Sequence, residues 1–165
     1  MASATPSRGL ANQLAYGDRA RILLVNKDPQ DLAYYREILQ KLRCRVRASL
    51  SFDEGVQCLG GEPFDLIILD QGCGKSEGRE VLARAMEVDV ELRVLVLARS
   101  YSKGCYLEAM QSGALDYHEG FLSAAEIAAF LDTFIPRRNG AHGTSVNRAK
   151  GAGPSKEIMS KVKSN

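Results

Sequence analysis

Asp70 has a carboxylate that could take part in chemistry, because of its position in the sequence. It ends an apolar run, and the residues from Phe64 to Gly78 read FDLIILDQGCGKSEG. A short apolar run bounded by turn residues indicates a strand that is buried on both faces, as in a parallel sheet. Open α/β sheets place their ligands at the carboxyl ends of such strands, so Asp70 is a candidate site residue. The alternative is that Asp70 only caps the turn or helix that follows.

A second polar group follows an earlier apolar run that begins at Arg21, and it consists of Asn26, Lys27 and Asp28. If the two strands are neighbours in a parallel sheet, these side chains end at the same edge as Asp70. Lys27 and Asp70 could then form an ion pair, whose Coulomb attraction is partly offset by the free-energy cost of desolvating the two charges. The alternative, that Lys27 points into solvent at the mouth of the loop, remains open.

The elements that must position these residues alternate five times between strand and helix patterns. Strand patterns cover residues 21–26, 45–50, 64–70, 93–98 and 115–118, and a helix pattern follows each of them. Helix starts are marked by Asp28-Pro29, by Ser102, and by two capping boxes at Ser51–Glu54 and Ser123–Glu126. This alternation predicts an α/β fold with a doubly wound, five-stranded parallel sheet, and right-handed crossovers favour the strand order 2-1-3-4-5.

Composition is that of one soluble domain with flanking segments. The chain has 165 residues, of which 45% are hydrophobic and 25% charged. Residues 1–19 are expected to form a flexible leader, residues 20–136 the folded domain, and residues 137–165 a disordered tail. No apolar run is long enough to span a bilayer, and the N-terminus lacks the apolar core of a signal peptide, which favours the cytoplasm. The four cysteines show no CxxC spacing, which argues against a zinc site and a disulfide framework.

Charge is distributed unevenly along the chain. Residues 1–136 carry a net charge of −4, and residues 137–165 carry +6. Seven cations without an aromatic residue predict at most weak, salt-sensitive and non-specific contact with polyanions. One cysteine of the glycine-rich loop, Cys73, is either an exposed redox-sensitive thiol or, as we favour, an inert loop residue.

Over about residues 21–136 the chain resembles a response-regulator receiver domain. Gly78 lies eight residues after Asp70, as in the D-x-x-M-P-x-x-x-G loop of that family. Gly113-Ala114 comes fifteen residues after Ala98, where the family has its G-A before strand five, and Tyr117 occupies the aromatic switch position. The resemblance implies the (βα)5 flavodoxin-like fold, with Asp70 at the position of the phosphoacceptor.

The resemblance also implies chemical groups that this chain lacks. The family holds Mg²⁺ with an acidic pair after strand one, and that pair falls on Asn26 and Lys27. Asp28 corresponds to the third acid of the run, although a helix cap explains it more simply. Ala98 replaces the switch Thr or Ser, and Gly120 (or Glu119) replaces the lysine after strand five. Phosphoryl transfer depends on positioning and charge neutralisation, so these changes predict a degenerate pseudo-receiver.

We therefore expect a non-enzymatic signalling module without a cofactor or catalytic residue, which acts through contact with a histidine kinase or a downstream effector. The alternative is a weak but genuine phosphoacceptor of a two-component phosphorelay, taking phosphate on Asp70 with Mg²⁺. A flavodoxin-like cofactor binder is disfavoured, because residues 26–29 have neither the glycines nor the hydroxyls of a phosphate-binding loop. Because no pattern of a DNA-binding domain follows the receiver-like unit in the sequence, we expect no direct role in transcription.

The expected partner surface is the one that the family reads: the fourth helix, the fifth strand and the fifth helix. Tyr106, Met110 and Tyr117 belong to these elements. Ala98 has no hydroxyl and leaves room beside Tyr117, so the ring could rest inward without a signal. The alternative is that Tyr117 simply packs in the core and that partners use another surface.

Overall fold

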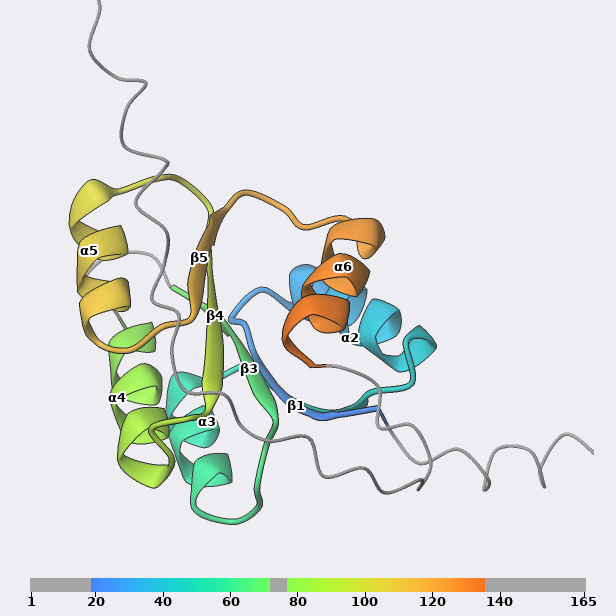
Figure 1. Cartoon of the computed structure of the whole chain (residues 1–165), viewed down its shortest axis with the longest axis horizontal. Coiled ribbons are helices and arrows are strands. Elements are labelled where there is room, and N and C mark those ends of the chain that lie inside the picture. Colours follow the sequence, from blue (N-terminus) through green and yellow to red (C-terminus); the bar gives the residue numbers. More distant parts are fainter. Residues whose placement is uncertain (1–18, 72–76, 136–165) are drawn as a thin grey trace, which may run out of the picture.

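The structure is a five-stranded parallel sheet between two layers of helices (Figure 1). The computed structural model describes residues 19–71 and 77–135. The strand order is β2-β1-β3-β4-β5, and every neighbouring pair is parallel. The predicted fold class and strand order are therefore confirmed. The strands are β1 (Arg21–Val25), β2 (Arg45–Ser49), β3 (Leu66–Asp70), β4 (Arg93–Ala98) and β5 (Asp116–Glu119).

The helices divide between the two faces of the sheet. Right-handed crossovers place the helix between β1 and β2 on one face and the helices that lead to β3, β4 and β5 on the other, because the step from β1 to β2 runs in the opposite direction across the sheet. Figure 1 shows α2 and α6 on one face, and α3, α4 and α5 on the other. The bounds are α2 (Pro29–Lys41), α3 (Phe52–Leu59), α4 (Gly78–Val88), α5 (Lys103–Gln111) and α6 (Ala124–Phe134).

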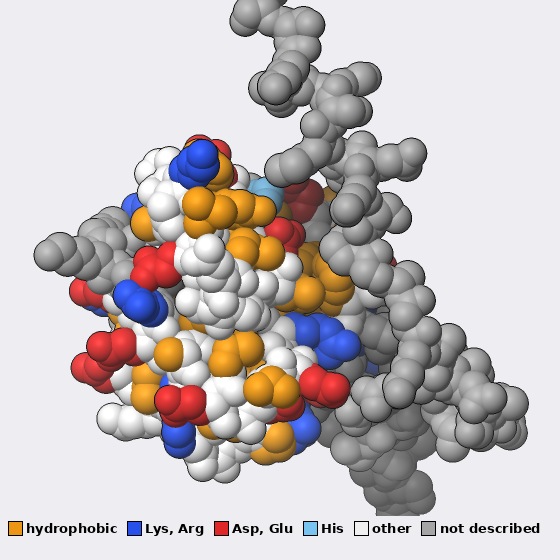
Figure 2. Space-filling view, turned by 60° about the vertical axis from the view of Figure 1, so that its left-hand side comes forward, with side chains coloured by type: hydrophobic (Ala, Val, Ile, Leu, Met, Phe, Trp, Pro, Cys, Tyr) orange, Lys and Arg blue, Asp and Glu red, His pale blue; other side chains and the backbone are white. Residues whose placement is uncertain are grey.

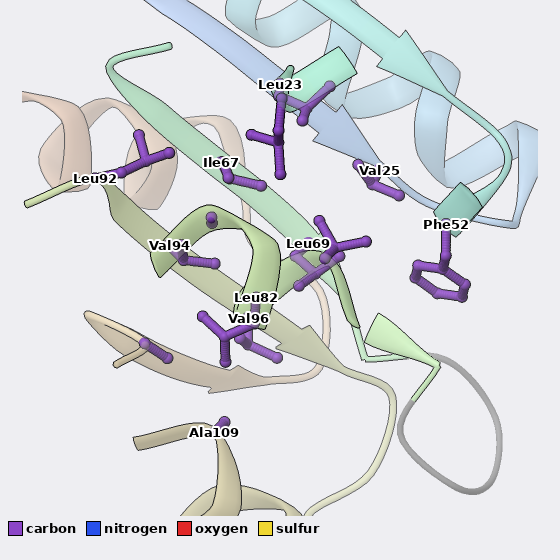
Figure 3. Close-up of a cluster of buried hydrophobic side chains, with 14 of the residues drawn as sticks. Leu23, Val25, Phe52, Ile67, Leu69, Leu82, Leu92, Val94, Val96 and Ala109 are labelled. Atoms are coloured by element: carbon purple, nitrogen blue, oxygen red, sulfur yellow. The ribbon is translucent and has the colours of Figure 1, made fainter. Parts of the chain in front are cut away.

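Each face of the sheet has its own hydrophobic core. Successive side chains of a strand point to opposite faces, so Leu23 joins one core and Leu24 the other. The core under α3, α4 and α5 is drawn in Figure 3, where β1, β3 and β4 contribute Leu23, Ile67 and Val94. The side chains of all three are fully buried. This two-sided burial is why β1, β3 and β4 read as nearly continuous apolar runs.

The predicted helix starts are largely confirmed. Asp28 accepts hydrogen bonds from the backbone N–H groups of Gln30 and Asp31, and Ser123 forms a complete capping box with Glu126. The capping box at Ser51 was wrong in one half. Ser51 does accept from the N–H of Glu54, but the Glu54 carboxylate accepts from the Ser49 hydroxyl at 2.8 Å. The hydroxyl that ends β2 therefore replaces the backbone donor.

The boundaries of the domain differ slightly from those expected. Arg19, assigned to the leader, is buried and belongs to the folded domain. Its guanidinium contacts Asp132 of α6 at 2.6 Å and donates to the carbonyl oxygen of Ile135. The rest of the expected leader, the expected tail and Cys73 lie outside the described residues. No helix within the described ranges is long and apolar enough to cross a membrane.

Gly78, the first residue of α4, lies against the end of the central strand. A methyl group added at its Cα would stand 2.8 Å from the backbone oxygen of Asp70, closer than carbon and oxygen can pack. The spacing from Asp70 to Gly78 thus has a steric cause, because only glycine lets α4 begin so close to the end of β3.

We expect Gly78→Ala to destabilise the domain by about 1–3 kcal/mol, since the added methyl group must displace backbone atoms. Gly104, in the first turn of α5, is a matched control because a methyl group added there would lie 3.9 Å from Oγ of Ser102, an ordinary contact distance. Gly104→Ala should leave stability unchanged or raise it by about 0.5–1 kcal/mol. Urea unfolding measures both effects, and equal stability of the two variants would contradict the close approach.

Candidate functional site

An open hollow lies at the carboxyl edge of the sheet. It has a volume of about 270 Å³. Four of the lining residues directly end or follow β1, β3, β4 and β5, namely Asn26, Asp70, Ala98 and Gly120. The structure therefore brings together four of the positions singled out in the sequence. The remaining lining residues are Asp31, Tyr35, Leu97, Arg99 and Phe121.

Asn26 is buried, and its amide oxygen is already engaged. The residue is only 3% exposed, and its Oδ1 atom accepts a hydrogen bond from the N–H of Asp28 at 2.8 Å. This bond closes a turn between β1 and the N-terminus of α2. Asn26 thus serves the local backbone at the position where the family has an acid.

Asp28 is held by two sets of donors. Oδ1 caps α2 by accepting from the N–H groups of Gln30 and Asp31, and Oδ2 accepts from Nη2 of Arg99 at 2.8 Å. The Arg99 hydrogen bond is the main cause that lowers the pKa of Asp28, and the two backbone hydrogen bonds add to it. The predicted helix cap is confirmed, and an interaction with Arg99 accompanies it.

Arg99 reaches from the end of β4 to the N-terminus of α2. The same Nη2 atom that contacts Asp28 lies 3.3 Å from Oδ2 of Asp31. Since β3 lies between β1 and β4, the side chain passes the end of the strand that carries Asp70. One guanidinium therefore interacts with two carboxylates at the rim of the hollow.

Lys27 does not form the ion pair considered from the sequence. Its Nζ lies 2.7 Å from Oε2 of Glu77, the residue before α4, and 5.1 Å from the ring centroid of Phe52. The lysine side chain remains 48% exposed. A cation–π contact and a solvent-exposed carboxylate are available there without the desolvation that a pair inside the hollow requires. Among the described residues, the carboxylate that pairs with Lys27 is therefore Glu77 and not Asp70.

Residues without a functional side-chain group, Ala98 and Gly120, occupy the positions of the switch hydroxyl and of the lysine. Ala98 is buried, and its carbonyl oxygen accepts from the N–H of Gly120 at 2.8 Å. Gly120 has a φ of +85°, a conformation that glycine adopts at little cost and that strains residues with a side chain. The local backbone thus favours glycine where the family has lysine.

Tyr117 points into the core near the end of β3. It is 8% exposed, and its hydroxyl donates to Oε1 of Gln71, the residue after Asp70. Burial is the main cause that raises the pKa of Tyr117. The ring meets that of Tyr106 edge to face, with centroids 5.7 Å apart. Tyr117 is therefore both a core residue and a direct neighbour of the candidate site.

Comparison with known proteins agrees with this geometry. The family model of the response regulator receiver domain matches residues 22–131, more than half of the chain. The chain belongs to this family. Receiver domains are signalling modules that interact with histidine kinases and effectors, and they are generally not enzymes.

Two relatives are transcriptional regulators that are longer than this chain. The transcriptional regulatory protein QseB of Haemophilus influenzae is 33% identical over 129 residues, which cover 78% of this chain and 58% of QseB. The alginate biosynthesis transcriptional regulatory protein AlgB of Pseudomonas aeruginosa is 30% identical over 99 residues, which cover 60% of this chain and 22% of AlgB. The match to this receiver chain thus spans less than two thirds of either relative.

Solved structures share the fold. A CheY-like receiver domain protein from Methanospirillum hungatei has a TM-score of 0.65 at 21% identity, over 68% of this chain and 90% of that one. The BeF3-activated DrrB receiver domain has a TM-score of 0.64 at 24% identity, over 72% of this chain and 98% of that one.

The hollow of this receiver domain does not fit the magnesium ion that the family implies. Mg²⁺ needs oxygen ligands in octahedral geometry. Here the Asn26 oxygen and both Asp28 oxygens are engaged by other groups, and Arg99 places a positive charge at the rim. Within residues 19–71 and 77–135, no group of three or more His, Cys, Asp or Glu side chains is arranged to hold a metal ion.

Three residues of the receiver site were not predicted from the sequence: Arg99, Gln71 and Glu77. Each contacts a residue that was singled out, at separations of 71, 46 and 50 positions along the chain. No periodic pattern marks such contacts. The one available signal was position, because Arg99 and Gln71 each directly follow a residue predicted to end a strand.

We expect Arg99→Ala to raise the pKa of Asp28 toward its ordinary value of about 3.9, because the largest stabilising hydrogen bond of the carboxylate is lost. In the native chain, the ionised Asp28 stabilises the fold above its ordinary pKa, and this stabilisation is lost as the pH falls through the lowered pKa of the folded state. The variant should show a smaller stabilisation of this kind. Carboxyl ¹³C NMR titration measures the shift. Arg84→Ala, which removes an exposed arginine paired with Glu87 on α4, is the control and should leave Asp28 unchanged.

Proposed function

We propose that this receiver domain is a signalling module of the pseudo-receiver type, which binds its partner without a phosphorylation switch. The observation that carries the proposal is the inward, hydrogen-bonded position of Tyr117, in the same core cluster as Ala98. We place the module in the cytoplasm, with a histidine kinase or a downstream effector as its partner.

The buried tyrosine supports a fixed state. In the family, the aromatic residue of strand five turns inward when the switch hydroxyl is drawn to the phosphoryl group. Here the residue at the hydroxyl position is Ala98, and Tyr117 is inward with its hydroxyl bonded to Gln71. Burial, a hydrogen bond and the contact with Tyr106 hold the ring without any phosphoryl group. The outward position of the ring would lose all three interactions and would therefore be sparsely populated, so the ring behaves as a fixed element.

The chemistry of the hollow supports the same proposal. Phosphoryl transfer relies on cations and donors positioned around the transferred group. Asn26 and Asp28 are engaged in local bonds, Ala98 lacks a hydroxyl, and Gly120 lacks an amine. Lys27 is turned toward Glu77. Phosphorylation of Asp70 would therefore lack most of the groups that accelerate it.

The proposed partner surface is formed by α5, β5 and the exposed side of α6. Tyr106 is partly buried, and its ring centroid lies 6.2 Å from that of Tyr101, which is 55% exposed. Leu107 adds an exposed apolar side chain, and Met110 packs beside the core. Tyrosine is enriched where proteins bind each other. Figure 2 shows the α4 and α5 side, where separate hydrophobic groups stand between acidic and basic side chains.

The second candidate function is a weak phosphoacceptor in a two-component phosphorelay, with Mg²⁺ as cofactor. One observation favours it: Asp70 ends β3, lines the hollow and is only partly buried. A small phosphodonor could therefore reach the carboxylate. The two functions differ in whether phosphate ever appears on Asp70.

We expect no phosphate uptake by the full chain during incubation with Mg²⁺ and a small phosphodonor such as acetyl phosphate. The intact mass should stay unchanged, because the metal ligands, the hydroxyl and the lysine are replaced. Asp70→Asn is the control. A phosphorylated species that forms on the native chain and is absent from Asp70→Asn would favour the second candidate function.

We expect Tyr106→Ala to weaken binding to a partner, once isolated by cross-linking, by more than about fivefold, which corresponds to the loss of a central interface aromatic. Leu50→Ala is the control, since Leu50 is a 48% exposed apolar residue that follows β2, the strand at the opposite edge of the sheet from β5. Titration with and without phosphodonor should give the same affinity. Unchanged binding of a folded Tyr106→Ala would exclude this surface.

We also expect Tyr117→Phe to lower the free energy of unfolding by about 0.5–1.5 kcal/mol, because the hydrogen bond to Gln71 is lost while the ring stays in place. Chemical denaturation measures this change. Gln71→Ala should have a similar effect, and the double variant should be little worse than either single one. Additive effects would show that the two side chains do not interact in solution.

A further inference from the structure

Arg99 is the only cation among the described side chains that line the hollow. Its Nη2 atom lies 2.8 Å from Oδ2 of Asp28 and 3.3 Å from Oδ2 of Asp31. Asp70 also acts on it. The pKa of Arg99 is raised first by the Asp28 hydrogen bond, then by the charges of Asp31 and Asp28, and finally by that of Asp70. The negative charges of Asp28, Asp31 and Asp70 thus all act on one guanidinium.

The other candidate cation points elsewhere. Lys27 directly follows Asn26 in sequence, but its ammonium group contacts Glu77 and the ring of Phe52. Arg21 and Arg93 are the first residues of their strands, at the opposite edge of the sheet. Among the described cations, the one that lines the hollow is therefore Arg99, in the β4–α5 connection.

Guanidinium is well suited to this place. It stays charged at all physiological pH values, and its planar set of donors can engage two carboxylates at once. It is also covalently tethered, so its local concentration does not depend on the surrounding solution. A divalent ion that entered the hollow would meet this fixed positive charge and would find the Asp28 carboxylate already engaged.

We propose that Arg99 is the internal cation of this receiver domain, which takes the charge-neutralising role of a divalent ion and keeps such ions out of the hollow. This inference goes beyond the proposed function, because it concerns what the acidic hollow excludes rather than which partner the domain binds. It also predicts that the acidic residues regain affinity for a divalent ion when the guanidinium is removed.

The test is a titration of the full chain with Mn²⁺, a paramagnetic ion that accepts the same oxygen ligands as Mg²⁺. Broadening of backbone amide signals in ¹⁵N NMR spectra reports where the ion binds. We expect Arg99→Ala to bind Mn²⁺ on the order of tenfold more tightly than the native chain, as removal of one charge about 5 Å from a divalent ion implies. The broadened signals should include Asp31 and Asp70.

Two further variants locate the effect. Arg84→Ala removes one exposed arginine of α4 and should leave Mn²⁺ binding unchanged, which controls for net charge. Adding Asp31→Asn to Arg99→Ala should abolish the gained affinity, because Asp31 lines the hollow. Arg99→Gln, which removes the charge but keeps a polar side chain that can donate hydrogen bonds, serves if Arg99→Ala fails to fold.

Unchanged Mn²⁺ affinity in folded Arg99→Ala or Arg99→Gln would overturn the inference, and so would an equal gain in Arg84→Ala. A gain without broadening near Asp31 and Asp70 would also overturn it. The outcome is separable from that of the proposed function. If phosphate appears on Asp70 of the native chain while Arg99→Ala still gains Mn²⁺ affinity, the proposed function fails and the internal cation stands.

Discussion

The parallel pairing of β1, β3 and β4 is the constraint on which the site depends. Their registers align Val25 with Leu69, and Asp70 with Leu97, so the three strands end at one edge. The side chains that follow them are thereby brought within reach of each other. Burial of both faces fixes this arrangement, because a shift by one residue would move every core side chain to the wrong face.

Opposite charges meet at that edge of the sheet. The carboxylates of Asp31 and Asp70 line the hollow, and that of Asp28 lies beside it on Arg99, so acids this close together favour a nearby counter-charge. Here the counter-charge belongs to the chain. The same interaction ties the β4–α5 connection to the N-terminus of α2, so electrostatics and loop position are coupled in one contact.

The aromatic residues link this edge to the outer surface. Tyr117 contacts Gln71 on its inner side and Tyr106 on its outer side, and Tyr106 in turn lies near the exposed Tyr101. In the family, this region reports the state of the phosphoacceptor. The observed packing joins the same elements through a hydrogen bond and ring contacts, which need no phosphoryl group to form.

The sequence by itself determined the strands, the helix starts and the strand order, because apolar periodicity, caps and crossover handedness are local or topological rules. It also placed Asn26, Asp70, Ala98 and Gly120 at one edge of the sheet. Which charges meet there was decided only by tertiary structure. Long side chains choose among several partners at similar distances, and desolvation settles the choice. Arg99 therefore contacts the acids of α2, while Lys27 turns to an exposed partner, a preference that no spacing along the chain encodes.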